Sequence, residues 1–280
     1  TDPITGTVKD VGMLAIQITA NDLASSGAEP VGVMLTVLLP EEIEEEDIRE
    51  MMRQVEEACA HFHIQVMGGH TEVTRAVTQP VISVTGVGKV REDRLVSTAG
   101  AKPGQDILVT KWIGIEGTSI IAKEKEKELL ERFSQAFVDT AKGFDQYLSV
   151  LPDSRIAVEH GVSAMHDVTE GGIYGALWEV AEASGIGLEI DLKAIPIRQE
   201  TIEICEYFEL NPYYLISSGC MLMAADQGHD LVRKLEVAGI PAAVIGKATD
   251  GKARRIWNGG EESYLERPKT DELYKIYHKN

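Results

Sequence analysis

Four acidic residues stand beside small or polar residues in short segments typical of turns and strand ends. Hard divalent cations take oxygen ligands, and Mg²⁺ is usually held by one or two carboxylates together with the phosphates of a substrate. An acidic protein can bind ATP in this way, because the metal supplies the positive charge that lysine supplies elsewhere. The four residues are Asp2 in "TDP", Asp22 in "ANDLA", Glu72 in "GGHTE" and Asp167 in "MHDVTEGG".

Two glycine pairs lie in the same segments and offer a phosphate close access to the backbone. Gly171 and Gly172 open an expected helix, where we expect the first backbone N–H groups to be unpaired and to point outward. Glycine is costly in a helix, so packing alone does not favour it there. Gly68 and Gly69 offer a second such place, although tight turns are the other interpretation of both pairs. The templates G-x-x-x-x-G-K-[ST] and G-x-G-x-x-G are absent, which disfavours P-loop and Rossmann sites.

Two histidines share these segments. His70 lies two residues before Glu72, and His166 is next to Asp167. No H-E-x-x-H zinc motif and no G-x-S-x-G serine elbow is present. We expect His166 to be a hydrogen-bonded neighbour of Asp167 rather than a metal ligand, and the role of His70 stays open. The three cysteines form no C-x-x-C pair, so each is expected to be a buried small hydrophobe.

Composition and charge exclude several classes of partner. Of 280 residues, 44% are hydrophobic and 26% charged, a balance typical of a globular protein with a core. Lys and Arg number 27 against 45 Asp and Glu, which gives a net charge of −18. Nucleic acids and anionic membrane surfaces require cationic residues, so neither is an expected partner. No apolar run reaches the ~20 residues of a membrane span and no export signal is visible, which predicts a cytoplasmic protein.

Hydrophobic periodicity predicts a first unit of mixed strands and helices that closes near Gly100. Apolar residues recur at three- and four-residue steps through 41–62, as in an amphipathic helix. The acidic run after Pro40 is expected to form the solvated first turns of that helix. The expected elements are a helix over 11–27, a strand over 31–39, a helix over 41–62, and strands over 64–67 and 81–87, with a turn at Gly68 and Gly69.

A second unit of similar kind follows. Residues 118–150 are helical in pattern but too long for one helix of a globular domain, so we expect a break near Ser134 or Gly143. The short strands and varied connections indicate two α/β units of mostly antiparallel character. The other expected elements are strands in "DILVT", "VSAMHDV", "GLEIDL", "GCMLMAAD" and "PAAVIGKA", and helices containing 173–181 and "HDLVRKLEVAG".

Three of these segments together resemble one family. "ANDLASSGAEP" at 20–30, "GGHTEVT" at 68–74 and "MHDVTEGG" at 165–172 agree in order and spacing with the superfamily of aminoimidazole ribonucleotide (AIR) synthase. That superfamily, also called PurM-like, includes HypE, selenophosphate synthetase and thiamine-monophosphate kinase. "PGQDILVTKWIGIEGTSIIA" at 103–122 looks like the start of the family's C-terminal domain. The resemblance covers nearly the whole chain, and HypE is the member it resembles most.

The resemblance implies a fold and a chemistry. Residues 1–98 would form a β-barrel with their copy in a homodimer, residues 99–265 a ferredoxin-like α/β domain, and 266–280 a C-terminal helix or tail. ATP would lie in the cleft between the halves, near the dimer interface. The implied activity is ATP- and Mg²⁺-dependent activation of an amide or acyl oxygen of a small molecule as a phosphate ester, achieved mostly by positioning and charge neutralisation.

The resemblance also assigns roles to individual residues. The implied Mg²⁺ ligands are Asp2, Asp22 and Asp167. The implied ATP-binding residues are Asn21, Gly68, Gly69, Thr71, Thr169, Gly171 and Gly172. The candidate catalytic residues are Glu72, His70 and His166.

The sequence departs from the family pattern in three places. Relatives carry an acid directly after the first glycine pair, where this chain has His70. The glycine-rich acidic segment before the "TDP" strand is absent from a sequence that begins at Thr1, so poor nucleotide binding is expected. HypE proteins end in a cysteine that carries the carbamoyl group, whereas this sequence ends "YHKN", so that chemistry is not expected on its own C-terminus.

Two other functions stay open from the sequence. One is a noncatalytic, nucleotide-binding homodimeric scaffold, and the other is a small-molecule kinase like thiamine-monophosphate kinase. The HypE resemblance adds a hydrogenase-maturation protein as an expected partner.

Overall fold

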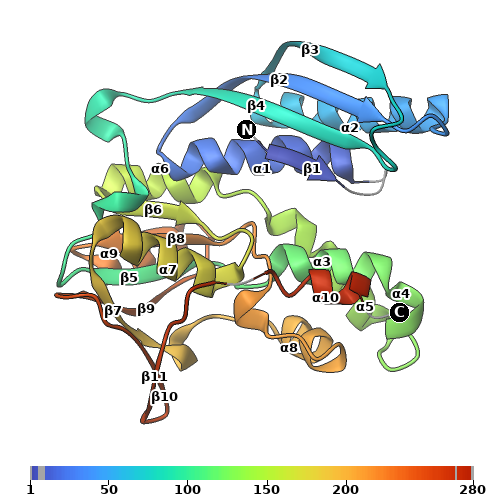
Figure 1. Cartoon of the computed structure of the whole chain (residues 1–280). Helices are drawn as coiled ribbons and strands as arrows, with labels where there is room; N and C mark the ends of the chain where they lie inside the picture. The colour runs from blue at the N-terminus through green and yellow to red at the C-terminus, as the bar shows by residue number, and fades with distance from the viewer. Residues whose placement is uncertain (1, 6–9, 269, 279–280) are drawn as a thin grey trace. The chain divides into compact units, whose positions relative to one another are not determined.

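The computed structural model describes residues 2–5, 10–268 and 270–278. The chain forms two compact units, Thr1–Leu95 and Val96–Asn280, called unit 1 and unit 2 below. Each unit has its own β-sheet and its own helices (Figure 1), which confirms the predicted mixed α/β class. None of the helices in the described ranges is long and apolar enough to cross a bilayer.

Unit 1 is a four-stranded sheet in the order β1-β4-β2-β3 with two helices. Helix α1 contacts α2, β2 and β4. Buried and exposed side chains alternate along β2 from Val33, so one face of this strand faces the core and the other faces solvent. The elements are β1 (Asp2–Thr5), α1 (Val11–Ser25), β2 (Glu29–Leu39), α2 (Glu45–Phe62), β3 (Gln65–Val73), β4 (Val81–Lys89) and the 3₁₀ turn η1 (Glu92–Arg94).

Each helix and strand predicted in unit 1 is present, but several boundaries shift, and the strand predicted over 64–67 extends to Val73. Helix α1 is followed by Gly27 in a left-handed conformation (φ 77°), whose N–H donates to the Ala24 carbonyl over 2.8 Å. Helix α2 begins at Glu45, so the prediction that the whole acidic run forms its first turns is wrong for the residues before it. The reason is a turn after Pro40, where the Ile43 N–H donates to the Pro40 carbonyl over 3.2 Å.

The prediction of a turn at Gly68 and Gly69 is wrong. Both glycines lie inside β3, which runs parallel to β2 with Gly69 opposite Leu35. A Cβ on Gly69 would lie 2.0 Å from the Leu35 carbonyl oxygen, so only glycine allows the two strands to approach this closely. A Cβ on Gly68 would meet nothing within 4 Å.

Unit 2 is built on a seven-stranded sheet in the order β11-β10-β7-β9-β5-β8-β6. Among its described strand pairs only β7 and β10 run parallel, which confirms the mostly antiparallel character. The elements are η2 (Thr98–Gly100), β5 (Asp106–Thr110), α3 (Ile115–Glu124), α4 (Glu126–Leu129), α5 (Gln135–Lys142), η3 (Gly143–Tyr147), α6 (Leu151–His160), β6 (Ala164–Asp167), α7 (Gly172–Ser184), β7 (Gly187–Asp191), η4 (Leu192–Ala194), α8 (Gln199–Tyr207), η5 (Pro212–Tyr214), β8 (Met221–Ala225), α9 (Gly228–Val237), β9 (Ala242–Thr249), β10 (Arg254–Asn258), β11 (Glu261–Tyr264) and α10 (Tyr274–His278).

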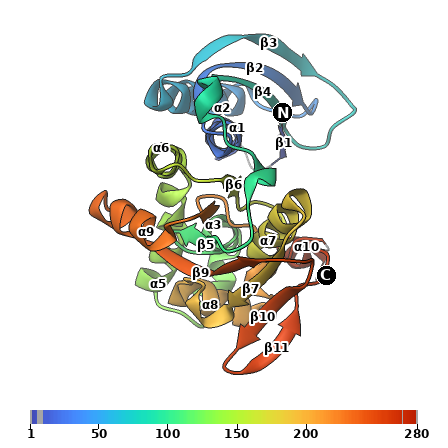
Figure 2. The same cartoon turned by 90° about the vertical axis from the view of Figure 1, so that its left-hand side faces the viewer.

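Two hydrophobic cores hold unit 2 together. The larger core lies between α7 and the central strands, while α6 and α9 contact β8 on the other side of the sheet (Figure 2). A second core joins α3, α5 and α8, and it includes Ile276 of α10. These helices gather beside the sheet in Figure 1. The central strands β5 and β8 are buried along their whole length because both faces are covered.

The helical breaks predicted in unit 2 are confirmed. Ser134 caps α5, with its side chain accepting a hydrogen bond from the Phe137 N–H, and Gly143 ends that helix. The sequence patterns did not predict α6, α8 or the hairpin of β10 and β11. Helix α6 starts with Pro152 in its first turn, a typical start signal that the long helical pattern before it obscured.

A matched pair of glycine substitutions tests the close pairing of β2 and β3. Gly69→Ala is expected to lower the free energy of unfolding by roughly 2 kcal/mol more than Gly68→Ala, because only the first places a methyl group against a fixed carbonyl. Both glycines have φ 155°, so the comparison isolates space from backbone strain. Urea unfolding of both variants measures the difference, and equal losses would show that the Leu35 contact is not limiting.

Candidate functional site

The predicted site residues of unit 2 lie where β6 leads into α7. Gly171 and Gly172 both adopt left-handed conformations, with φ 82° and 61°. A Cβ on Gly172 would lie 2.7 Å from the carbonyl oxygens of both Tyr213 and Leu215. Glycine is therefore required at the first residue of α7 by its backbone and by its neighbours, whatever else it does there.

The backbone N–H groups at this helix start are not unpaired. Gly171 donates to Asp271 Oδ2 over 2.7 Å, and Gly172 donates to the Thr169 carbonyl over 3.0 Å. The expectation of free, outward N–H groups is therefore wrong for both glycines. Asp271 comes from the chain after β11, and it was not among the candidate residues.

His166 and Asp167 lie on β6, immediately before this turn. His166 Nε2 is 2.6 Å from Glu179 Oε2, whereas its Nδ1 is 3.7 Å from Asp167 Oδ1. His166 thus lies beside Asp167, as predicted, but its nearer partner is Glu179 on α7, which the sequence analysis did not identify. Burial would lower the pKa of His166, but the two carboxylates outweigh it and raise the pKa to about 9. Asp167 is buried, and its Oδ2 has no hydrogen-bond partner among the described residues.

Glu116 and Ser218 are buried polar residues of unit 2 that the sequence analysis missed. Within the described ranges, Glu116 Oε2 and Ser218 Oγ have no hydrogen-bond partner. Burial raises the pKa of Glu116 to about 7. The side chain and the backbone of Ser218 act to lower this pKa, whereas the negative charge of Asp271 raises it further. The signal available in the sequence was "GIEGTS", an acid among small residues at a helix start, as in the Asp167 segment.

The predicted residues of unit 1 differ in burial. Asn21 is 1% exposed, and its Oδ1 accepts a hydrogen bond from Gln17 Nε2 over 3.0 Å. Asp22 follows it on α1 and is partly buried. The backbone of Asp2 belongs to β1, but its side chain lies outside the described part of the chain.

The β3 candidates are exposed at the edge of the unit 1 sheet. Gly68, Gly69 and Thr71 all lie in this strand, whose side chains are exposed throughout. His70 Nε2 and Glu72 Oε2 are 3.6 Å apart, with side chains 69% and 57% exposed. Residues two apart in a strand share a face, which explains why these two approach each other.

The structure brings together His166, Asp167, Thr169, Gly171 and Gly172 in unit 2 but forms no complete metal site. Over residues 2–5, 10–268 and 270–278, no group of three or more His, Cys, Asp and Glu side chains is placed to hold a metal ion. Asp167 nevertheless suits a cation ligand, because a buried carboxylate oxygen without a hydrogen bond is costly and a bound cation would satisfy it.

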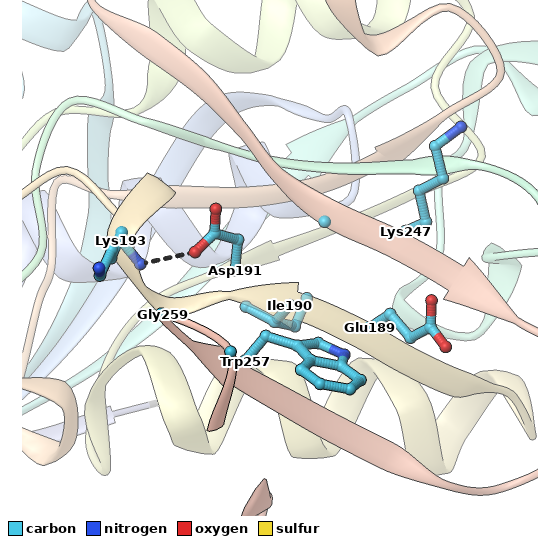
Figure 3. Close-up of a pocket in the computed structure, with 9 residues that line it drawn as sticks. Glu189, Ile190, Asp191, Lys193, Lys247, Trp257 and Gly259 are labelled. Atoms are coloured by element: carbon cyan, nitrogen blue, oxygen red, sulfur yellow. Dashed lines mark hydrogen bonds between the residues drawn. The ribbon is translucent and has the colours of Figure 1, made fainter. Parts of the chain in front are cut away.

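A pocket of about 410 Å³ lies elsewhere on unit 2, along β7, β9 and β10 (Figure 3). Its lining includes Trp257 and the carboxylate of Asp191, which accepts a hydrogen bond from the Lys193 N–H over 3.0 Å. None of the predicted site residues lines this pocket.

Sequence comparison identifies the family of both units. Residues 1–90 match the family "AIR synthase related protein, N-terminal domain", and 102–258 match the corresponding C-terminal domain. A hydrogenase expression/formation protein of Methanocaldococcus jannaschii is 31% identical over 245 residues, which cover 86% of this chain and 70% of that protein. Carbamoyl dehydratase HypE of Cupriavidus necator is 30% identical over 238 residues, covering 80% of this chain and 66% of that protein.

Solved HypE structures share the fold. One in complex with ATP has a TM-score of 0.84 at 22% identity, covering 98% of this chain and 85% of the other. One in a HypE–HypF complex has a TM-score of 0.82 at 22% identity, covering 95% and 89%. Both family domains and the curated relatives thus agree with the motif-based prediction, and the chain belongs to the AIR synthase-related family, with HypE proteins among its relatives.

Proposed function

We propose that the protein is an ATP- and Mg²⁺-dependent cytoplasmic enzyme that phosphorylates an amide or acyl oxygen of a small molecule. The Cupriavidus necator relative is named carbamoyl dehydratase, a name for an enzyme that removes water from a carbamoyl group. A HypE of the same fold has been solved in complex with ATP. An amide oxygen leaves poorly as hydroxide, but it leaves readily as phosphate once the γ-phosphoryl group of ATP has been transferred to it. The common chemistry is therefore activation of a carbonyl-type oxygen for elimination or displacement.

The observation that carries this proposal is Asp167. Its buried Oδ2 lacks a hydrogen-bond partner in the described structure, and it lies four residues before the glycine pair that opens α7. A buried carboxylate near the N-terminus of a helix suits a metal–phosphate group. The carboxylate would bind the cation, and the helix N-terminus would favour the phosphate anion. When bound, Mg²⁺ neutralises phosphate charge, and the carboxylates of this chain would hold it.

The residue roles follow the family resemblance. Asp2, Asp22 and Asp167 would hold Mg²⁺. Asn21, Gly68, Gly69, Thr71, Thr169, Gly171 and Gly172 would bind the nucleotide. Glu72, His70 and His166 are the groups proposed to face the reacting oxygen.

The surface of unit 1 supports a homodimer. Strand β3 is an edge strand of the sheet, and its side chains are exposed along its whole length. An exposed edge with apolar side chains is a surface for pairing with another chain. We propose that two copies of this sheet join into one barrel. The large apolar residues exposed on β2, β3 and β4 are Met34, Val66, Met67, Val73 and Val87.

The remaining architecture and partners are also proposals. We assign 1–98 to the N-terminal domain, 99–265 to a ferredoxin-like C-terminal domain and 266–280 to a terminal helix or tail. A hydrogenase-maturation protein is a proposed partner, because one relative bears that name and another HypE is solved with HypF. The excess of acidic residues gives no support to nucleic acid as a partner.

Nucleotide binding tests the site directly. Asp167→Asn and Asp22→Asn are each expected to weaken binding of ATP with Mg²⁺ by about ten-fold or more, since a contact to a charged group contributes ~1.5–3 kcal/mol. Asp191→Asn changes the same type of residue in the pocket of Figure 3 and should leave the affinity unchanged. Calorimetric titration of each variant measures the affinities.

Three outcomes of this experiment would be informative. If only the Asp191 variant binds ATP more weakly, the nucleotide binds in the pocket of Figure 3 and not at the start of α7. Binding by the unaltered protein without ADP release in the presence of primary amides and carbamoyl compounds would favour the noncatalytic scaffold. A stable phosphorylated product would favour a small-molecule kinase.

A charged residue at the β3 edge tests the homodimer. Val66→Lys is expected to convert a dimer into a monomer at micromolar concentration, because a lysine at an exposed edge opposes strand pairing. Val237→Lys, at an apolar residue 91% exposed on α9 of unit 2, serves as the control and should stay dimeric. Light scattering coupled to size-exclusion chromatography measures the mass, and a monomeric unaltered protein would exclude this assembly.

A further inference from the structure

A short segment after β11, residues Asp271–Ile276, contacts the start of α7 through its first residue. We call this segment the terminal strap. The Asp271 side chain is buried, with its Oδ2 accepting from the Gly171 N–H over 2.7 Å and its Oδ1 from the Leu273 N–H over 2.8 Å. The Ile216 amide also favours the ionised form of Asp271. Backbone amides from α7, from the loop before β8 and from the strap itself thus converge on one carboxylate, as they would on a bound anion.

The strap is anchored at two further places. The Asn211 N–H donates to Glu272 Oε2 over 3.0 Å, and the Glu272 N–H donates to the Tyr214 carbonyl over 3.3 Å. Ile276 packs into the core of α3, α5 and α8. These contacts hold the strap to unit 2 independently of the Asp271 carboxylate, so that carboxylate can leave Gly171 while the strap stays attached.

The surroundings of Asp271 oppose its negative charge. Burial raises the pKa of Asp271, the three amides act against this, and Glu170 adds to the increase. Glu116 is a second buried acid within electrostatic range, and Tyr274 on the strap titrates only at high pH because its own pKa is raised. Lys275 pairs with Glu272 instead, at 2.6 Å. Glu170 and Glu116 thus place like charge near the Asp271 carboxylate, which opposes its ionised form.

We propose that Asp271 is a built-in competitor for the phosphate-binding end of α7, and that a phosphate group binds there only when the Asp271 carboxylate gives up the Gly171 N–H. This regulation rests on the function proposed above, because it concerns the same helix start. A ligand whose site is open for only a fraction of the time binds with an affinity reduced by that fraction. The strap therefore sets the nucleotide affinity without taking part in the chemistry.

Two isosteric substitutions in the strap of the full chain test the competition. Asp271→Asn removes the charge at Gly171 and is expected to tighten binding of ATP with Mg²⁺, and of inorganic phosphate, by about ten-fold. Glu272→Gln makes the same change one residue away, where the carboxylate meets Asn211 and not α7, and should leave both affinities unchanged. Calorimetry gives the ATP affinity, and chemical shifts of the Gly171 amide give the phosphate affinity.

A measurement on the unaltered protein guards against misfolding of the variants. The Gly171 and Leu273 amides are both held by Asp271, and hydrogen exchange at each is measured before and after ATP with Mg²⁺ or phosphate is added. At Leu273 exchange should speed up, because its acceptor moves away, and at Gly171 it should stay slow, because phosphate replaces the carboxylate. Unchanged exchange at the Leu273 amide on saturation with ligand would overturn the competition.

The outcomes separate this inference from the proposed function. Unchanged or weakened binding in Asp271→Asn, with a folded protein, would show that Asp271 only caps α7. If ATP binds neither the unaltered protein nor its variants, while phosphate still displaces Asp271 from Gly171, the proposed nucleotide function is contradicted and the competition is not. Failure of phosphate to bind either Asp271→Asn or the unaltered protein would overturn the competition itself.

Discussion

Close packing around Leu215 is the constraint on which the centre of unit 2 depends. A Cβ on Gly172 would lie 2.7 Å from the Leu215 carbonyl oxygen, and a Cβ on Gly117 would lie 2.5 Å from the Leu215 Cγ. The starts of α7 and α3 thus both pack against the buried Leu215. Each helix start has a glycine at its contact with this residue, because a side chain there would clash with it. Glu116 lies in the first turn of α3, and Asp167 ends the strand that leads into α7, so both acids stand close in sequence to this packing.

The sequence predicted most elements that have a clear hydrophobic period. Strands bounded by proline or glycine and the amphipathic helices followed from local pattern alone. The turn expected at Gly68 and Gly69 failed because the need for glycine there is not local. It arises from the Leu35 carbonyl on a neighbouring strand, and no pattern within the segment reports a contact of that kind.

The candidate site was predicted in part. The segment from His166 to Gly172 was found because acids and glycines stand together in it. Its true partners were not: Glu179 lies thirteen residues away on α7, and Asp271 lies a hundred residues away in the sequence. Side chains that complete a site from distant segments leave no trace in local spacing, and the buried acids Glu116 and Asp271 acquire their properties only from the fold that surrounds them.

The place of Ile276 in a core of unit 2 has a consequence for how the protein folds during synthesis. The core of α3, α5 and α8 lacks one of its buried side chains until the chain has been made as far as α10. The sheet and helices of unit 1 all lie within Thr1–Leu95, so they can begin to form while the rest is still being translated. Unit 2 can complete the packing of this core only after α10 has been made.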